Sequence, residues 1–224
     1  RYVDIYKALE DIARDRTLTP EERKEMKLYS RLADAFTPLA KGMNSEYANQ
    51  NAYDAISVHG GSGFIMEYKC QRLFRDARIY SIYEGTTQLQ VVAAIRYVTN
   101  GTYLGIIKEM LEKEVAPEFQ ALKERVAKMV EKYEDAINYV KAAGNNDLHD
   151  FLARRLYEMT AEIIMSLLIL DDATRAPELF AKSANVYVRY AEGTVAGHYA
   201  YIKEFKAEDL ADFLAAAPEE APAE

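Results

Sequence analysis

Apolar residues recur at three- and four-residue steps over long segments of this 224-residue chain, and this spacing strongly constrains its fold. Sustained alternation of apolar and polar residues, which is typical of half-buried strands, is nearly absent. Glycine and proline fall mostly between the periodic segments. Because half of the residues are hydrophobic, the chain can bury a sizeable core. The sequence therefore predicts an all-α fold built from long helices.

The clearest helix start lies at Thr19. A capping threonine is followed by Pro20 at the first helical position and by Glu22 at the third, and this combination satisfies the unpaired amides of a helix start. We expect a helix over residues 19–41, with its last turn kinked or frayed by Pro38 because proline lacks an amide hydrogen.

Further helices are predicted downstream of this start. A second long helix is expected over residues 45–60, where a glycine just past the helix end takes the left-handed conformation at little cost. A shorter helix is expected over residues 67–78. The next should begin near residue 85 or 86 and end at Asn100-Gly101. Its apolar face is predicted to comprise Val91, Val92, Ile95 and Val98.

The character of the chain changes after Gly101, with longer helices and more Lys and Glu. Apolar seams over residues 119–140 and 148–170 predict two bundle helices, and the segment Asn145-Asn146-Asp147 between them is expected to connect the two and cap the second. A third bundle helix is expected over residues 177–205, packed through Phe180, Tyr187, Tyr190, Tyr201 and Phe205. We therefore predict domains at 1–100 and 101–206, followed by a short helix and a disordered acidic tail over 207–224.

Composition excludes several classes of function. Acidic residues outnumber basic ones by 36 to 28, and a net charge of -8 argues against nucleic acid or an anionic membrane as partner. No apolar run of 18 residues predicts membrane insertion. The single cysteine, Cys70, excludes an internal disulfide and suits a reducing compartment, so we expect a cytoplasmic protein. No histidine has a carboxylate or histidine at the spacing of a metal pair, and no metal site is predicted.

Two segments could carry chemistry. In Tyr83-Glu84-Gly85-Thr86 the Glu84 carboxylate is expected at an apolar helix entrance, where loss of solvation makes a carboxylate a better general base. The glutamate could instead simply favour the positive end of a helix. Gly85 lets a flat ligand approach the backbone, or merely begins a helix. The glycine loop over residues 60–63 could bind a pyrophosphate through its amides, or only reverse the chain.

The order and spacing of these motifs resemble a known family. Gly60-Gly61-Ser62-Gly63-Phe64, Arg75-Asp76-Ala77-Arg78 and Tyr83-Glu84-Gly85-Thr86 resemble, in register, the C-terminal helical domain of acyl-CoA dehydrogenases. The extension over residues 101–206 resembles that of longer members such as the methylthio-acyl-CoA dehydrogenases. The resemblance implies a flavin-dependent oxidoreductase of fatty acid metabolism that works on acyl-CoA thioesters.

The resemblance also implies roles for residues of the second motif. Glu84 matches the glutamate that removes the pro-R α-proton of an acyl-CoA while the β-hydrogen leaves as hydride to FAD, which gives the trans-2-enoyl-CoA. Tyr83 and Gly85 are its neighbours and are expected at the substrate thioester.

Cofactor contacts are implied for four residues. Gly60 and Gly61 match the loop that reaches the FAD of a neighbouring subunit, and Thr86 and Gln88 match residues that hydrogen-bond the flavin dinucleotide. Thr86 and Gln88 could equally cap a helix. Ser57 departs from the family, which has a glutamine three residues before the glycine pair, and its shorter side chain cannot make the same reach.

The resemblance covers only part of a family member. The N-terminal helical domain and the middle β-domain have no counterpart here, and the chain starts at Arg1 within a helical pattern. We therefore expect a C-terminal fragment that is inactive alone, from a homodimer or tetramer with electron-transfer flavoprotein as acceptor. A non-catalytic helical assembly module and an acyl-CoA oxidase remain as alternatives.

Overall fold

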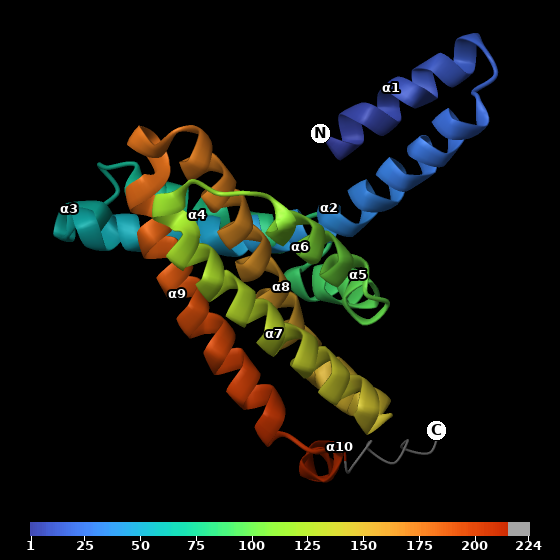
Figure 1. Ribbon diagram of the computed structural model, residues 1–224. Helices are drawn as coiled ribbons and strands as arrows, with labels where there is room; N and C mark the ends of the chain where they lie inside the picture. The colour runs from blue at the N-terminus through green and yellow to red at the C-terminus, as the bar shows by residue number, and fades with distance from the viewer. Residues whose placement is uncertain (215–224) are drawn as a thin grey trace, which may run out of the picture. The chain divides into compact units, whose positions relative to one another are not determined.

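The computed structural model describes residues 1–214, and this part of the chain is helical without a strand (Figure 1). The predicted all-α fold is confirmed. The chain divides into two compact units, between Tyr97 and Val98. The domain boundary predicted after residue 100 lies a few residues further along, and the predicted acidic tail over 215–224 lies outside the described residues.

The first unit begins with α1 (Tyr2–Asp15) packed along the start of α2 (Pro20–His59) (Figure 1). Aromatic rings join the two helices, because the Tyr2 ring lies 5.9 Å from that of Tyr29 and 5.4 Å from that of Phe36. Aromatic pairs at such centroid distances add to the free energy of apolar burial.

The predicted capping box at the start of α2 is present. Thr19 Oγ1 accepts a hydrogen bond from the Glu22 amide at 3.2 Å, and Glu22 Oε2 accepts one from the Thr19 amide at 2.8 Å. The Arg16 guanidinium lies 2.6 Å from Glu22 Oε1. Hydrogen bonds from Arg16 and from the Thr19 backbone lower the pKa of Glu22 to about 2. The cap therefore carries an ionised carboxylate at the positive end of the helix.

One continuous helix replaces the two that were predicted over residues 19–41 and 45–60. α2 runs for 40 residues with Pro38 inside it, so the prediction of a break was wrong. Pro38 removes a single amide, and its ring is buried. Packing of the buried ring thus outweighs the loss of one amide hydrogen bond.

Short elements follow and pack on α2. They are α3 (Gly61–Phe64), α4 (Cys70–Ala77) and the 3-10 turn η1 (Arg78–Ser81). The helix predicted over residues 67–78 is therefore shorter than expected.

α5 (Thr87–Thr99) forms where a helix was predicted, but one residue of its expected apolar face lies elsewhere. Val91, Ala94, Ile95 and Val98 are buried, whereas Val92 is 58% exposed. Steps of three and four residues keep side chains on one face, and Val92 lies one residue, about 100°, off that stripe.

The second unit is a bundle preceded by one shorter helix, α6 (Thr102–Glu112), which was not among the predicted helices. Its long helices are α7 (Gln120–Ala143), α8 (Asn146–Arg175) and α9 (Pro177–Glu204), and each packs against the other two (Figure 1). Short turns link them: η2 (Pro117–Phe119) precedes α7, and η3 (Ala207–Leu210) and α10 (Ala211–Leu214) follow α9.

Polar groups at the bundle helices are satisfied locally. Within the segment predicted to cap α8, Asn145 is the capping residue, since its Oδ1 accepts from the Leu148 amide at 2.8 Å. Tyr133 on α7 and Thr160 on α8 are buried, and their hydroxyls lie 2.6 Å apart. Such a pair fixes the two helices in register without leaving an unpaired polar group in the core.

The seams of α7 and α8 are buried as predicted, but that of α9 is not the one expected. Its buried residues are Ala184, Val188, Ala191, Val195 and Ile202, whereas Tyr190 is 57% exposed. Small side chains let α9 approach α7 and α8 closely, and the larger rings pack at the edge of the seam. Phe151, Tyr201 and Phe205 form one such edge cluster, with Tyr201 and Phe205 centroids 4.7 Å apart.

None of the helices within residues 1–214 combines the length and the apolarity needed to cross a membrane.

Candidate functional site

The predicted base lies in a turn of unusual backbone geometry between η1 and α5. Glu84 has φ 53°, and it is the residue other than glycine with positive φ among those described. Gly85 follows with φ 94°. A side chain in this region costs about 1 to 2 kcal/mol relative to ordinary helical backbone. Such a conformation persists where surrounding contacts determine it, and residues of this kind cluster at functional sites.

Side chains from α2 and α5 hold the carbonyls of this turn. Lys41 Nζ, from α2, donates to the Gly85 carbonyl. Gln90 Nε2 donates to the same carbonyl at 3.3 Å and to the Glu84 carbonyl at 3.4 Å. A Cβ on Gly85 would lie 2.8 Å from Gln90 Nε2, so the contact with Gln90 also requires glycine here. The turn is therefore fixed to two helices.

A second link joins the start of α5 to α2. Thr87 is buried and its Oγ1 donates to Glu46 Oε1 at 2.5 Å. Thr86 Oγ1 accepts from the Leu89 amide at 3.3 Å, so its hydroxyl caps the helix in this chain. Gln88, on the first turn of α5, is exposed. The carboxylate of Glu46 thus orients the residue that follows the motif.

The Glu84 carboxylate is not enclosed by the described residues. Its side chain is exposed, so the apolar environment expected from the sequence is not provided by residues 1–214. The apolar neighbours on which that expectation rested are themselves exposed, at 58% for Tyr80, 46% for Ile82 and 57% for Leu89. Tyr83 is 64% exposed. This part of the first unit presents apolar side chains outward, which soluble monomers rarely do over large areas.

The glycine loop lies at the C-terminal end of α2. Gly60 ends the helix with φ 59° and Gly61 begins α3, and both are exposed. A Cβ on Gly61 would meet no atom within 4 Å, whereas one on Gly63 would lie 2.6 Å from the Ile56 carbonyl oxygen. Gly63 is therefore needed for packing and Gly61 is not. Ser57 lies one turn earlier, where its carbonyl accepts from the Gly60 amide at 3.2 Å.

The two predicted parts of the site do not converge within one molecule. Lys41 contacts the turn of Glu84, and Gly60 lies 19 residues further along the same axis. At a rise of 1.5 Å per residue this separation is roughly 28 Å. Tyr83, Glu84, Gly85 and Thr86 share one turn, and Gly60 and Gly61 are remote from it.

Sequence reasoning missed the residues that hold the turn. Lys41 and Glu46 lie more than 40 residues before their partners, and no local spacing links them to Gly85 or Thr87. Gln90 is one helical turn after the motif, so a contact with the motif's carbonyls was detectable in principle.

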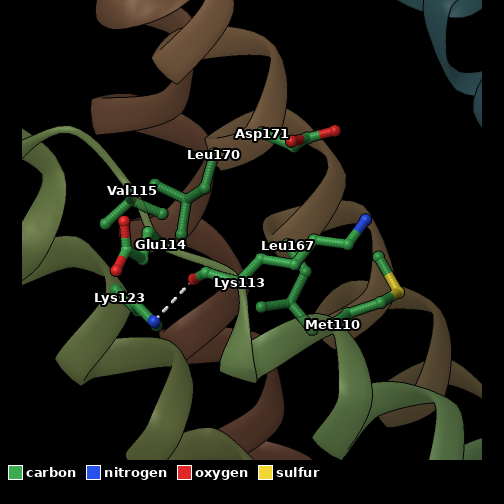
Figure 2. Close-up of a pocket in the computed structure, with 8 residues that line it drawn as sticks. All are labelled: Met110, Lys113, Glu114, Val115, Lys123, Leu167, Leu170 and Asp171. Atoms are coloured by element: carbon green, nitrogen blue, oxygen red, sulfur yellow. Dashed lines mark hydrogen bonds between the residues drawn. The ribbon is translucent and has the colours of Figure 1, made fainter.

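Neither of two hollows in the second unit contains a predicted site residue. Figure 2 shows a cavity lined by Met110, Lys113, Glu114, Val115, Lys123, Leu167, Leu170 and Asp171. Lys123 Nζ donates to the Lys113 carbonyl at 2.7 Å across it (Figure 2). Its volume of about 10 Å³ suits a single water molecule. A larger apolar groove of about 300 Å³ lies between α8 and α9, lined by Met165, Leu168, Ile169, Asp172, Ser183 and Tyr187.

Among the side chains that the structure describes, no three from His, Cys, Asp or Glu are arranged to bind a metal ion.

Two models of known protein families match this chain. A model described as "Acyl-CoA dehydrogenase, C-terminal domain" matches residues 19–98, and one described as "Acyl-CoA dehydrogenase C terminal" matches residues 99–210, half of the chain. The chain belongs to the acyl-CoA dehydrogenase family. The motif from Gly60 to Thr86 lies within the first match.

Individual relatives of this acyl-CoA dehydrogenase family member are similar over short stretches. The "Caffeyl-CoA reductase-Etf complex subunit CarC" of Acetobacterium woodii is 48% identical over 52 residues, which are 23% of this chain and 14% of that protein. An acyl-CoA dehydrogenase of Bacillus subtilis is 39% identical over 64 residues, 29% of this chain and 17% of that protein. The matched stretches thus span less than a fifth of these relatives.

A solved structure shares the fold over almost the whole chain. The acyl-CoA dehydrogenase complexed with FAD from Bacillus anthracis matches with a TM-score of 0.66 at 18% identity. The match covers 96% of this chain and 40% of that one. At this identity the likeness concerns the fold alone.

Proposed function

We propose that this chain is the C-terminal part of an FAD-dependent acyl-CoA dehydrogenase, in which Glu84 removes the α-proton of an acyl-CoA thioester to form the trans-2-enoyl-CoA. The observation that carries the proposal is the turn at Glu84, whose carboxylate is exposed on a strained backbone that Lys41 and Gln90 hold in place. A carboxylate that is open to a ligand and projects from a backbone turn held in place suits proton abstraction at a fixed carbon.

The exposed surroundings support a site completed by other parts of a longer protein. Apolar side chains at Tyr80, Ile82, Tyr83 and Leu89 remain exposed beside the carboxylate in sequence. A domain or substrate placed over them would remove water from Glu84 and make it a better base. Gly85 and Tyr83 are proposed to contact the thioester.

The glycine loop suits FAD, because Gly60 and Gly61 are exposed and Gly61 has open space where a Cβ would be, so a flat group can approach the backbone. When bound, FAD supplies the acceptor for the substrate's two electrons. The separation of roughly 28 Å along α2 between Lys41 and Gly60 supports a loop that contacts the FAD of a neighbouring subunit. Thr86 and Gln88 are proposed to contact the FAD that lies at the turn.

The substrate and the electron acceptor are supported by the relatives. Two of them are named for acyl-CoA chemistry, and one is the subunit of a reductase-Etf complex. We therefore propose acyl-CoA as substrate and electron-transfer flavoprotein as redox partner. The same relative, together with the "3-(aryl)acrylate reductase" of Clostridium sporogenes, 47% identical over 58 residues, favours a second candidate. In that candidate Glu84 returns the α-proton, and the longer protein reduces an aryl-enoyl thioester.

The decisive experiment replaces Glu84 by glutamine in the longer flavoprotein. Glutamine keeps size and hydrogen bonding but removes the basic site, so anaerobic flavin reduction by acyl-CoA should slow by roughly 10²-fold or more. Glu67→Gln is the matched control, because Glu67 is also exposed and lies in the same unit. An unchanged rate in Glu84→Gln would assign the base to another residue.

The proposed assembly is a homodimer or a dimer of dimers. Sedimentation equilibrium of the chain over a dilution series should report a two-fold species, since the exposed apolar side chains of the first unit need a cover. A strictly monomeric chain at micromolar concentration would refute the proposed assembly and the proposed contact of Gly60 with the FAD of a neighbouring subunit.

A further inference from the structure

Lys41 has an unusual partner for a lysine in the middle of a long helix. Its side chain is half-buried, and its ammonium donates to a main-chain carbonyl, that of Gly85, 44 residues further along the chain. Lysine side chains on such helices normally reach solvent or a carboxylate. A charged donor on a neutral carbonyl makes a stronger bond than a neutral donor does.

The carbonyl that Lys41 holds belongs to the turn of the proposed base. Glu84 and Gly85 both have positive φ, a conformation that a glutamate adopts only when other contacts hold it. Lys41 and Gln90 both donate to the carbonyl of the Gly85–Thr86 peptide, which directly follows the two residues with positive φ. α2 is a continuous helix of 40 residues, so the bond ties the turn to a long, regular element.

We propose that Lys41 is the positioning residue of the base: by donating to the Gly85 carbonyl it holds the Glu84–Gly85 turn in its strained conformation and thereby aims the Glu84 carboxylate at the α-carbon. The inference rests on the proposed role of Glu84 and adds a residue that acts through the main chain of the turn. Thr87 and Glu46 hold the far side of the turn, so Lys41 acts on orientation and not on folding of α5.

The contact is measurable in the chain itself. Labelling glycine with ¹³C at the carbonyl and threonine with ¹⁵N selects Gly-Thr peptide bonds, and the sequence has three, after Gly85, Gly101 and Gly193. In Lys41→Met the correlation of the Gly85–Thr86 peptide should shift, while the other two serve as internal controls and stay in place. Lys41→Arg, which keeps a cationic donor, should shift it less. An unmoved Gly85–Thr86 correlation in Lys41→Met would overturn the proposal.

Catalysis in the longer flavoprotein gives the second test. Butyryl-CoA, octanoyl-CoA and phenylpropionyl-CoA are screened as probes, and the one that reduces the flavin fastest is used. Lys41→Met should lower the limiting rate constant of flavin reduction at least tenfold while the dissociation constant of the probe stays within twofold. Lys41→Arg should recover most of the rate. Lys24→Met, an exposed lysine of the same helix, should match the unmodified protein.

The two tests separate the inference from the function on which it rests. A shifted Gly85–Thr86 correlation together with an unaffected rate in Lys41→Met would refute the positioning role. Failure of Glu84→Gln to slow the reaction would instead refute the assignment of the base, and the carbonyl shift in the isolated chain would not change.

Discussion

Replacing Gly85 by alanine tests the strained turn directly. Gly85 has φ 94°, where an added Cβ costs about 1 to 2 kcal/mol. That Cβ would also lie 2.8 Å from Gln90 Nε2, and the flexible amide must withdraw from two carbonyls to make room. These bonds are long, at 3.3 and 3.4 Å, and their combined loss adds about 1 kcal/mol. The expected total is about 2 to 3 kcal/mol of local stability.

Hydrogen exchange resolved by residue measures this loss where it occurs. The amides of Tyr83 and Gln90 donate to the Ile79 and Thr86 carbonyls and report on opening of the turn. At 1.36 kcal/mol per tenfold change, a loss of 2 to 3 kcal/mol accelerates their exchange about 30- to 150-fold. Amides of α7 to α9 belong to the other compact unit and should not change.

Gly197→Ala is the matched control. Gly197 lies within α9 with no atom within 4 Å of an added Cβ, so alanine there should stabilise the helix by about 0.5 to 1 kcal/mol. Equal exchange at Tyr83 and Gln90 in Gly85→Ala and the unmodified chain would refute the reasoning, because it would mean that the turn is not held in the positive-φ conformation.

Two further predictions concern packing and ionisation. Gly63→Ala should destabilise the first unit in thermal unfolding, because its Cβ would lie 2.6 Å from a backbone oxygen, whereas Gly61→Ala should not. Burial raises the pKa of Glu158, but hydrogen bonds from His198 and Arg154 outweigh it and lower the pKa overall. The ionised carboxylate therefore stabilises the folded chain at any pH above its ordinary pKa of 4.5, and this stability is lost as the pH falls through the lower pKa of the folded state. In urea unfolding, Glu158→Gln should be less stable than the unmodified chain at pH 7 and equally stable in strong acid.

The sequence predicted those parts of the fold that local chemistry decides. The Thr19 cap and the Asn145 cap follow from side chains within three residues of the amides that they satisfy. The seams of α7 and α8 follow from helical periodicity alone. Pro38 misled the prediction, because the burial that keeps α2 continuous through a proline is decided by tertiary packing. The face of α9 differs from the prediction too, because large rings predict the core by their apolar area, whereas small residues allow the closer approach of helices.

The same difference between local and distant contacts decides how much of the candidate site could be predicted. Motif and spacing located Glu84 and the glycine loop, since each is a contiguous run of residues. They could not show that Glu84 takes a positive φ, because that conformation depends on Lys41, which is far away in sequence. They also could not show its exposure, because the expected apolar neighbours lie beside it in sequence yet leave it uncovered.

The length of α2 explains why one such chain presents an incomplete site. A helix of 40 residues rises about 60 Å, and its middle carries Lys41 under the Glu84 turn while its end carries Gly60. A continuous helix over residues 41–59 keeps these two points apart in every conformation that preserves it. Because α2 is continuous from Lys41 to its end at His59, the loop cannot fold back toward the turn of its own molecule. If both serve one reaction, each therefore needs a complementary part from outside residues 1–214, and for the glycine loop we propose that this part belongs to another copy.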